Sequence, residues 1–448
     1  MSSIRLNRSC FGWSWLPISL GIMVITSCGP RHSRQRVSQP PTRLTHASDT
    51  KSDGSDLPTT EPKPAKADLP PRLDLAKVSY SDLKGWNSDK HGEALTTFLR
   101  SCKVLMRMPP QKAIGINPVT GIAKEWREPC KNAAWVKKKA SAVNEDLRAR
   151  RFFERYFTPY AASNRGDRLG RFTGYYNARL RASRKKSKKF SVPVYARPSD
   201  LVSIDLGAFF PKYKGERLWG RIKGTRMVPF DTRAEIYAGS LGKRAKVLLW
   251  ASSLVDVFFA QVQGSATVDL REGKTTRIGV GGKNGHIYTA IGRVLIRDGE
   301  LARAKVSMQS IRQWLLDHPA KAQGLLEANK AYIFFREYQG PGPFGSQGVV
   351  VTPGRTLAVD LRMIAHSVPI WLETEVPALS GSTDVEPWQR LMIAQDTGGA
   401  IRGPVRGDIY FGDSESAFAR AGRMKGAGQY YLLLPNAIVV EQAEEEER

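Results

Sequence analysis

Two aspartates near the C-terminus have the surroundings that acid–base chemistry requires. Asp396 ends the segment LMIAQD and is followed by TGG, and Asp408 opens the segment DIYFG twelve residues later. Glycines after a strand let backbone or ligand approach closely, so the pattern predicts two carboxylates at neighbouring strand ends. Burial and mutual repulsion can raise the pKa of one carboxylate until it donates a proton near neutral pH. The alternative is that each aspartate caps a turn.

Motifs for other chemistries are missing from the sequence. It contains no GxSxG, P-loop, HExxH or CxxC motif, so neither a metal nor a cofactor is expected. The glycine-rich run IGVGGKNGH at 278–286 lacks the GK[ST] ending of a phosphate loop. Asp396 stands in the only D[ST]G triplet, so an aspartic protease would require a dimer with one such loop from each subunit.

The N-terminal residues 1–27 have the features of an export signal. Arg5 and Arg8 precede an apolar stretch at 11–25 that is too short to span a bilayer. The stretch ends in Ile-Thr-Ser before Cys28, which resembles the lipobox of bacterial lipoproteins and makes Cys28 the expected lipidated residue. An ordinary secretory signal is the alternative. Gly29 is not the aspartate that retains lipoproteins in the inner membrane, so we expect the periplasmic face of the outer membrane.

Export also decides how the charge and the cysteines are interpreted. The 69 Lys and Arg against 42 Asp and Glu give a net charge of +27, which outside the cytoplasm indicates anionic wall polymers or lipid headgroups and not nucleic acid. The dense run RASRKKSKK at 181–189 is interpreted as a solvated loop. Cys10 leaves with the signal, so Cys102 and Cys130 remain for a disulfide in an oxidising compartment, with two buried free thiols as the alternative.

The remaining sequence predicts helices first and short strands afterwards. Residues 28–72 are rich in Pro, Ser, Thr, Asp and Lys and are expected to form a disordered tether. Apolar spacing predicts helices over 95–106, 133–157 and 307–319, with Cys102 on the first and Cys130 just before the second. Beyond Gly170 most segments are short, β-branched or aromatic, and bounded by Gly or Pro. The pattern indicates a mainly β fold with peripheral helices and an acidic tail at 437–448.

Six motifs together resemble one family. They occur in the order FTGYY, DTRAEIYAG, VQGSATVDL, GKNGHIYTAIG, TLAVDLRMI and DTGGAIRGPVRGDIYFG. This series is similar to the membrane-bound lytic murein transglycosylase A (MltA) family over about residues 90–436. The resemblance implies a double-psi β-barrel of the three-aspartate (3D) type, built from 73–171 and 337–436. A second β domain at 172–336 is inserted into it, with a sugar-binding groove between the two.

The resemblance also implies residue roles. Asp408 matches the catalytic acid, Asp396 its supporting carboxylate and Asp360 a structural aspartate. Tyrosine rings would support sugar faces, and amide and hydroxyl groups would bind hydroxyl and acetamido groups. The positions that match the family's groove are Thr173, Gly174, Tyr175, Gln263, Gly264, Ser265, Lys283, Asn284 and Tyr288. One departure is IAHSVP at 364–369, where the family has an IPxGxP-like turn.

The implied reaction is cleavage of the β-1,4 bond between N-acetylmuramic acid and N-acetylglucosamine without water. The C6 hydroxyl closes a 1,6-anhydro ring, and Asp408 alternates as acid and base. The expected partners are peptidoglycan glycan strands, the membrane through the lipid anchor, and other wall-synthesis or wall-degrading proteins. Two rivals stay open: a non-catalytic wall-binding lipoprotein with an expansin-type barrel, and a hydrolase that leaves reducing ends.

The lipobox yields a direct test. Cys28→Ser removes the thiol that would be acylated, so the variant should leave the membrane fraction for the soluble fraction. The measurement is immunoblotting of the two fractions after export. A variant that stays membrane-bound would rule out Cys28 as the anchor.

Overall fold

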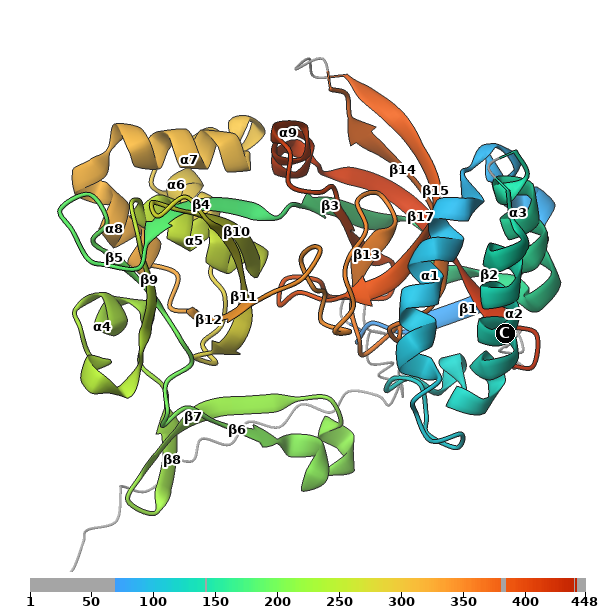
Figure 1. Cartoon of the computed structure of the whole chain (residues 1–448), viewed down its shortest axis with the longest axis horizontal. Helices are drawn as coiled ribbons and strands as arrows, with labels where there is room; N and C mark the ends of the chain where they lie inside the picture. Colours follow the sequence, from blue (N-terminus) through green and yellow to red (C-terminus); the bar gives the residue numbers. More distant parts are fainter. Residues whose placement is uncertain (1–68, 142, 380–383, 439, 441–448) are drawn as a thin grey trace, which may run out of the picture. The chain divides into compact units, whose positions relative to one another are not determined.

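The computed structural model describes residues 69–141, 143–379, 384–438 and 440 (Figure 1). The predicted signal peptide, most of the predicted tether and most of the acidic tail lie outside these residues. The first strand, β1 (Leu73–Lys77), begins where the sequence predicts the onset of order, and pairs with β2 (Phe157–Asn164). Among the described residues, no helix combines the length and the apolar character needed to cross a bilayer.

Three helices precede the barrel strands: α1 (His91–Leu105), α2 (Ala123–Lys139) and α3 (Glu145–Tyr156). The single helix predicted over 133–157 is therefore wrong. Helix α2 starts ten residues earlier and carries Pro129 in its interior, which as a helix breaker masks the pattern in the sequence. The break falls where Ala140 is extended, between three lysines in the last turn of α2 and acidic residues in the first turn of α3. The positive charges stabilise the C-terminus of α2 and the negative charges stabilise the N-terminus of α3, because each opposes the helix dipole at that end.

Helices α1 and α2 are joined by a disulfide between Cys102 and Cys130, whose Cα atoms are 5.4 Å apart. The sequence had indicated that Cys130 lies just before a helix, but in the structure it lies within α2. Both cysteines are buried in the core. Their separation of 28 residues corresponds to a stabilisation of about 3–4 kcal/mol if the bond acts through the entropy of the unfolded chain.

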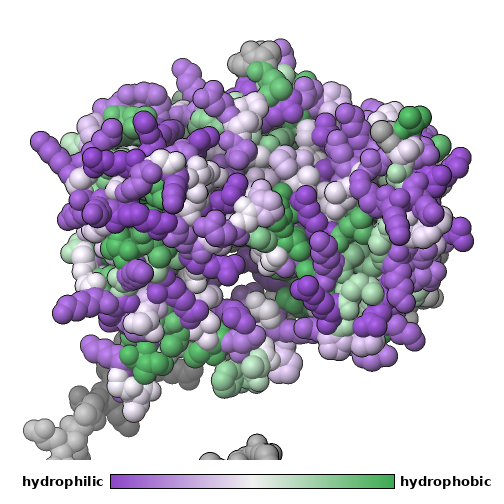
Figure 2. Space-filling model, in the orientation of Figure 1, coloured by the Kyte–Doolittle hydropathy of each residue, from purple (hydrophilic) through white to green (hydrophobic). Residues whose placement is uncertain are grey.

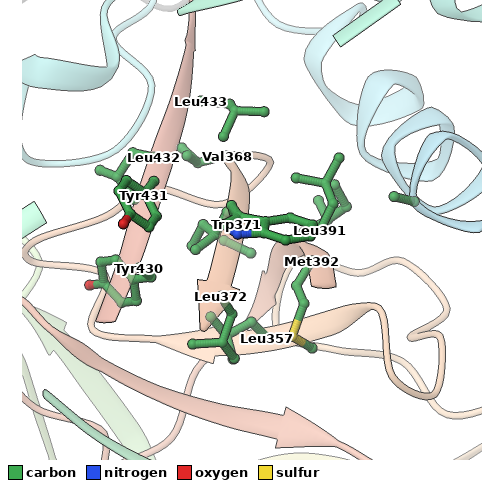
Figure 3. Packing of buried hydrophobic residues seen from close by; sticks show 14 of the residues in the cluster. Leu357, Val368, Trp371, Leu372, Leu391, Met392, Tyr430, Tyr431, Leu432 and Leu433 are labelled. Atoms are coloured by element: carbon green, nitrogen blue, oxygen red, sulfur yellow. The ribbon is translucent and has the colours of Figure 1, made fainter. Parts of the chain in front are cut away.

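Six strands close into a barrel, in the order β17, β14, β15, β13, β16 and β3, because β3 also pairs with β17. Leu357, Trp371, Met392 and Leu432 are fully buried in its core (Figure 3). Helix α9 (Glu415–Arg423) packs against β3. The barrel strands are β3 (Gly170–Tyr175), β13 (Thr356–Val359), β14 (Pro369–Pro377), β15 (Val385–Asp396), β16 (Arg406–Tyr410) and β17 (Gly426–Pro435).

A second β domain is inserted between β3 and β13 and has its own buried cores. The expected fold class, mainly β with peripheral helices and an inserted β domain, is confirmed. The insert's main sheet has the order β12 (Ile333–Tyr338), β11 (Thr275–Lys283), β10 (Ser265–Leu270), β4 (Ala178–Ser183), β9 (Val247–Ala251) and β5 (Val192–Tyr195). The boundaries predicted for the insert, residues 172 and 336, fall inside strands β3 and β12. Because β3 is a barrel strand, residues 173–175 belong to the barrel and not to the insert.

Helices and a small sheet complete the insert. The helix predicted over 307–319 is confirmed: Ser307 caps α7, and Pro319 begins α8 directly after it. The run 181–189 starts in β4 and then forms the link to β5, where Arg184 pairs with Glu337. The other elements are α4 (Arg233–Tyr237), α5 (Leu254–Gln263), α6 (Ile291–Arg297), α7 (Met308–Asp317), α8 (Pro319–Glu327), β6 (Val202–Asp205), β7 (Arg217–Lys223) and β8 (Arg226–Pro229).

The turn that departs from the family pattern keeps an unusual backbone. Ser367 has φ 81° and so occupies the left-handed region that glycine prefers, at the position of glycine in the IPxGxP-like turn. Its N–H donates to the carbonyl of Ala394 (2.7 Å), and its Oγ accepts from Gln347 Nε2 (2.6 Å). These contacts offset the cost of about 1 kcal/mol of a non-glycine residue in this conformation. The turn at 364–369 therefore leads into β14 with Ser367 at the position where the family has glycine.

Candidate active site

The strand register brings the two aspartates to opposite sides of one small residue. Ala358 of β13 pairs with Asp396 of β15 on one side and with Asp408 of β16 on the other. Side chains of paired residues share a face of the sheet, so both carboxylates lie on the face that carries the Ala358 side chain. Asp360 follows two residues after Ala358, at the end of the same strand. The three aspartates therefore gather at one end of the barrel.

Asp408 is half-buried, and only one of its two carboxyl oxygens accepts a hydrogen bond from the described residues. Thr173, its register partner in β3, donates from Oγ1 to Asp408 Oδ1 (2.6 Å) and accepts from Arg406 Nη2 (2.8 Å). Burial raises the pKa of Asp408 to about 6, against the opposing effects of the Thr173 hydroxyl and the Arg406 charge. Asp408 Oδ2 receives no hydrogen bond from the described part of the chain. A carboxyl group in this state can hold a proton on Oδ2 near neutral pH and release it.

Asp396 differs because both of its oxygens accept hydrogen bonds. Oδ1 accepts from the backbone N–H groups of Ser346 (2.9 Å) and Thr397 (2.8 Å), and Oδ2 accepts from Tyr175 Oη (2.9 Å). Burial raises its pKa, and these donors act against that rise. The same environment raises the pKa of the Tyr175 phenol, first through burial and then through the Asp396 charge. Asp396 is thus held in place, with three of its roughly four acceptor positions occupied.

Asp360 has the environment of a structural residue. Its carboxylate is fully buried, pairs with Arg362 (2.7 Å), and accepts from the backbone N–H of Gly403 (2.9 Å). Burial by itself would raise the pKa of Asp360, but these donors outweigh it and the pKa is lowered. Arg402 lies 3.6 Å from the same carboxylate. The ionised group therefore fastens the 398–403 segment to the end of β13.

The aspartates line a cavity of about 670 Å³. Figure 2 shows the surface hollowed between the barrel and the insert. Among the groove residues expected from sequence, five lie on its wall: Tyr175, Gln263, Gly264, Ser265 and Lys283. Gly264 has φ 81° at the end of α5, which lets the chain turn sharply into β10 at the cavity.

The other four expected groove residues do not line the cavity. Thr173 acts through Asp408, and Gly174 lies under the Phe411 ring, where an added Cβ would approach Phe411 Cε2 to 2.4 Å. Asn284 is buried and fully used: it donates to the carbonyls of Asp231 and Lys330 and accepts from the N–H of Tyr332. Tyr288 is 40% exposed and lies outside the cavity wall. In this structure Asn284 is therefore a structural residue, which corrects the expected hydrogen bond to sugar.

Tyr175 also has a different contact from the one expected. Its hydroxyl holds Asp396, and its ring packs at 42° against Tyr410, with ring centres 5.1 Å apart. The sequence had indicated a platform for a sugar face. The side chain reaches the cavity, but its polar end is committed to the carboxylate.

Two residues near Asp396 were missed by the sequence analysis. Besides its N–H bond to Asp396, Ser346 places its Oγ 2.9 Å from His366 Nε2. Burial lowers the pKa of His366 to about 4, so the imidazole is neutral at neutral pH. Ser346 lies fifty residues before Asp396, and no local motif marks either residue. The one sequence signal was the IAHSVP departure, which contains His366.

Comparisons with known proteins agree with this architecture. Residues 171–336 match the family model described as the MltA specific insert domain, and residues 355–434 match the 3D domain. Membrane-bound lytic murein transglycosylase A of Escherichia coli (strain K12) is 33% identical over 264 residues, which are 58% of this chain and 65% of that protein. The chain thus spans just under two thirds of this relative's length.

Solved structures extend the similarity to the whole fold. A membrane-bound lytic murein transglycosylase from Agrobacterium tumefaciens has a TM-score of 0.69 and 33% identity, covering 81% of this chain and 98% of that one. E. coli MltA with bound chitohexaose has a TM-score of 0.56 and 26% identity, covering 81% and 91%. The double-psi barrel with an inserted domain, expected from sequence, is consistent with the similarity to these neighbours.

The burial of Asp408 predicts a gain in stability when its charge is removed. The folded-state pKa of about 6 lies above the ordinary value of 3.8. Because the unfolded chain releases its proton first, the free energy of unfolding falls as the pH rises through that window. Asp408→Asn should therefore have a higher thermal midpoint than the parent protein at about pH 8, with a smaller difference at about pH 4.

The measurement is thermal unfolding of both proteins at the two pH values. Asp317→Asn, which removes an exposed carboxylate from α7, is the matched control and should have little effect. Equal midpoints for the parent and the Asp408 variant at the higher pH would show that burial of the Asp408 charge does not destabilise the fold.

Proposed function

Because the chain belongs to the membrane-bound lytic murein transglycosylase A (MltA) family, we propose that it cleaves peptidoglycan as a lytic transglycosylase. The bond cut is the β-1,4 link between N-acetylmuramic acid and N-acetylglucosamine, and the product end is 1,6-anhydromuramic acid. The observation that carries the proposal is the asymmetry of the two aspartates. Asp408 has a raised pKa and a free Oδ2, whereas both oxygens of Asp396 are engaged.

This asymmetry fits a reaction with one acid–base residue. Asp408 gives the proton on Oδ2 to the glycosidic oxygen as the bond to C1 breaks. The resulting carboxylate then takes the proton of the C6 hydroxyl, whose oxygen bonds to C1 and closes the anhydro ring. Asp408 ends protonated, as it began, and no water is consumed.

A hydrolase would need a second working carboxylate. Glycosidases that use water place one carboxylate as acid and the other as nucleophile or base. Asp396 is held by Tyr175, Ser346 and Thr397, which suits a role in orienting the site and tuning Asp408. A carboxyl group that lines a cavity with its pKa raised to about 6 is typical of a catalytic acid, which favours catalysis over wall binding alone.

Substrate binding is assigned to the cavity wall. Gln263 and Ser265 lie there with polar side chains, and Lys283 with a charged one. The E. coli relative was solved with chitohexaose, a sugar oligomer, which supports a glycan strand as the ligand of this cavity. We assign no cofactor to the reaction, because acid–base chemistry at Asp408 suffices for it.

The proposed location is the periplasmic face of the outer membrane, with Cys28 as the lipidated residue. The support is the lipobox-like sequence before Cys28 and the membrane-bound relatives. A long tether at 28–72 would let an anchored enzyme reach the wall. Other wall-synthesis or wall-degrading proteins are proposed as partners.

The products of purified peptidoglycan test the proposed reaction. The protein should release muropeptides with anhydro ends, identified by mass spectrometry, and Asp408→Asn should lower the rate by at least about a thousandfold because the only acid is gone. Products with reducing ends would identify a hydrolase. Undiminished cleavage by the variant would remove Asp408 from the mechanism.

The pH dependence of the rate tests the state of Asp408. The free enzyme must hold the proton, so kcat/KM should fall as the pH rises above about 6. Thr173→Val removes a hydrogen bond that favours the ionised form, so the pKa of Asp408 should rise and the fall should move to higher pH. Thr173→Ser keeps the hydroxyl and is the control. A fall at the same pH in Thr173→Val would show that another group sets the profile.

A further inference from the structure

The insert side of the cavity carries positive charge that the protein does not neutralise. Arg217 of β7, Lys283 at the end of β11 and Arg336 of β12 line the cavity, and we name these three residues the basic wall. Glu216 is the one acidic residue that the insert contributes to the lining among the described residues. The wall therefore has a net charge of about +2 when Glu216 is counted.

The local partners of the basic wall are few. Arg217 lies 3.6 Å from Asp205, an exposed and weak ion pair. Within the described ranges, no carboxylate lies within ion-pair distance of Lys283 or Arg336. Desolvation lowers the pKa of the exposed Lys283 side chain, and the nearby Arg402 charge adds to this effect while Glu216 opposes it. Lys283 and Arg336 are exposed at the cavity and unpaired, so their charges are available to an arriving anion.

The aspartates on the barrel side of the cavity do not neutralise the positive charge of the basic wall. The Asp360 carboxylate is already paired with Arg362, and Asp408 carries its proton at a pH below about 6. Asp396 and Asp408 are half-buried in the barrel and bound to their own neighbours. The barrel side thus carries three aspartates together with Arg362 and Arg402, whereas the insert side is basic and open.

We infer that the basic wall binds carboxylates that the substrate carries beside its neutral sugars. This inference rests on the proposed function. N-acetylglucosamine has no charge, and in a peptidoglycan strand the carboxylates belong to the peptide stems or, where a stem has been removed, to the lactyl group of muramic acid. The basic wall would hold such a group while the sugar chain lies along the cavity. It gives a preference for wall glycan over neutral chitin-type glycan.

The test measures binding without cleavage, in the full chain carrying Asp408→Asn. Three probes differ in charge: chitohexaose with no carboxylate, peptide-free glycan strands with lactyl carboxylates, and glycan strands with peptide stems. Lys283→Gln and Arg336→Gln should each weaken binding of anionic strands by about fivefold at low salt, and Arg336→Gln should leave the Kd for chitohexaose unchanged. The difference should shrink at high salt.

Matched variants separate a charge effect from other causes. Lys243→Gln and Arg303→Gln remove exposed charges of the insert away from the cavity and should leave every Kd unchanged. Lys283→Arg keeps the charge and should keep the affinity. A loss confined to stem-bearing strands would identify the stems, and an equal loss on peptide-free strands would identify the lactyl group.

Three results would overturn the inference. They are an unchanged affinity for both anionic strands, an equal loss on chitohexaose, or an equal loss in the Lys243 and Arg303 variants. Because binding is measured in a variant that does not cleave, these outcomes are independent of the products made by the parent protein. The absence of anhydro products would refute the proposed function even if the charge preference were found.

Discussion

The site depends on one short strand held between two others. β13 has four residues, is parallel to β15 and antiparallel to β16, and its residue Ala358 is the register partner of both Asp396 and Asp408. Because a slip of one residue turns every side chain to the opposite face, this register decides whether the two carboxylates meet. The closed barrel fixes it, since no strand at the site is left as a free edge.

The start of β13 is fastened by a buried arginine. Arg355 precedes the strand, is 1% exposed, and pairs with Asp89 (2.7 Å) and Glu93 (2.9 Å) from the region of α1. Asp89 also accepts the backbone N–H of Leu391 in β15. A buried ion pair adds little net stability, but removing one partner is costly, so its value here is the position it imposes. The N-terminal helices, locked by the disulfide, therefore support the register of the site.

The two domains contribute different side chains to one cavity. Asp396 and Asp408 are half-buried in the barrel, and desolvation raises the pKa of both. Hydrogen bonds then divide their roles, since three donors engage Asp396 while Thr173 leaves Asp408 Oδ2 open. The insert supplies polar and basic side chains from the opposite side. The chemistry belongs to the barrel, and the proposed selection of substrate belongs largely to the insert.

Local patterns in the sequence determined much of this protein. Alternating and β-branched segments predicted a β fold, and a strand running into TGG predicted a carboxylate at a strand end. The motif order identified the barrel, the insert and the three aspartates. Helix boundaries were less well determined, because Pro129 masked the start of α2 and a polar break divided α2 from α3.

Tertiary structure decided what each site residue does. The side chain of Asn284, expected to bind sugar, is hydrogen-bonded to four backbone groups, and the Tyr175 hydroxyl donates to Asp396. Ser346 and His366 join the site from a loop and a turn that no motif marks. The sequence by itself specifies which residues can titrate or bind. Only the fold sets their desolvation and their hydrogen-bond partners, because both depend on groups that lie tens to hundreds of residues away along the chain.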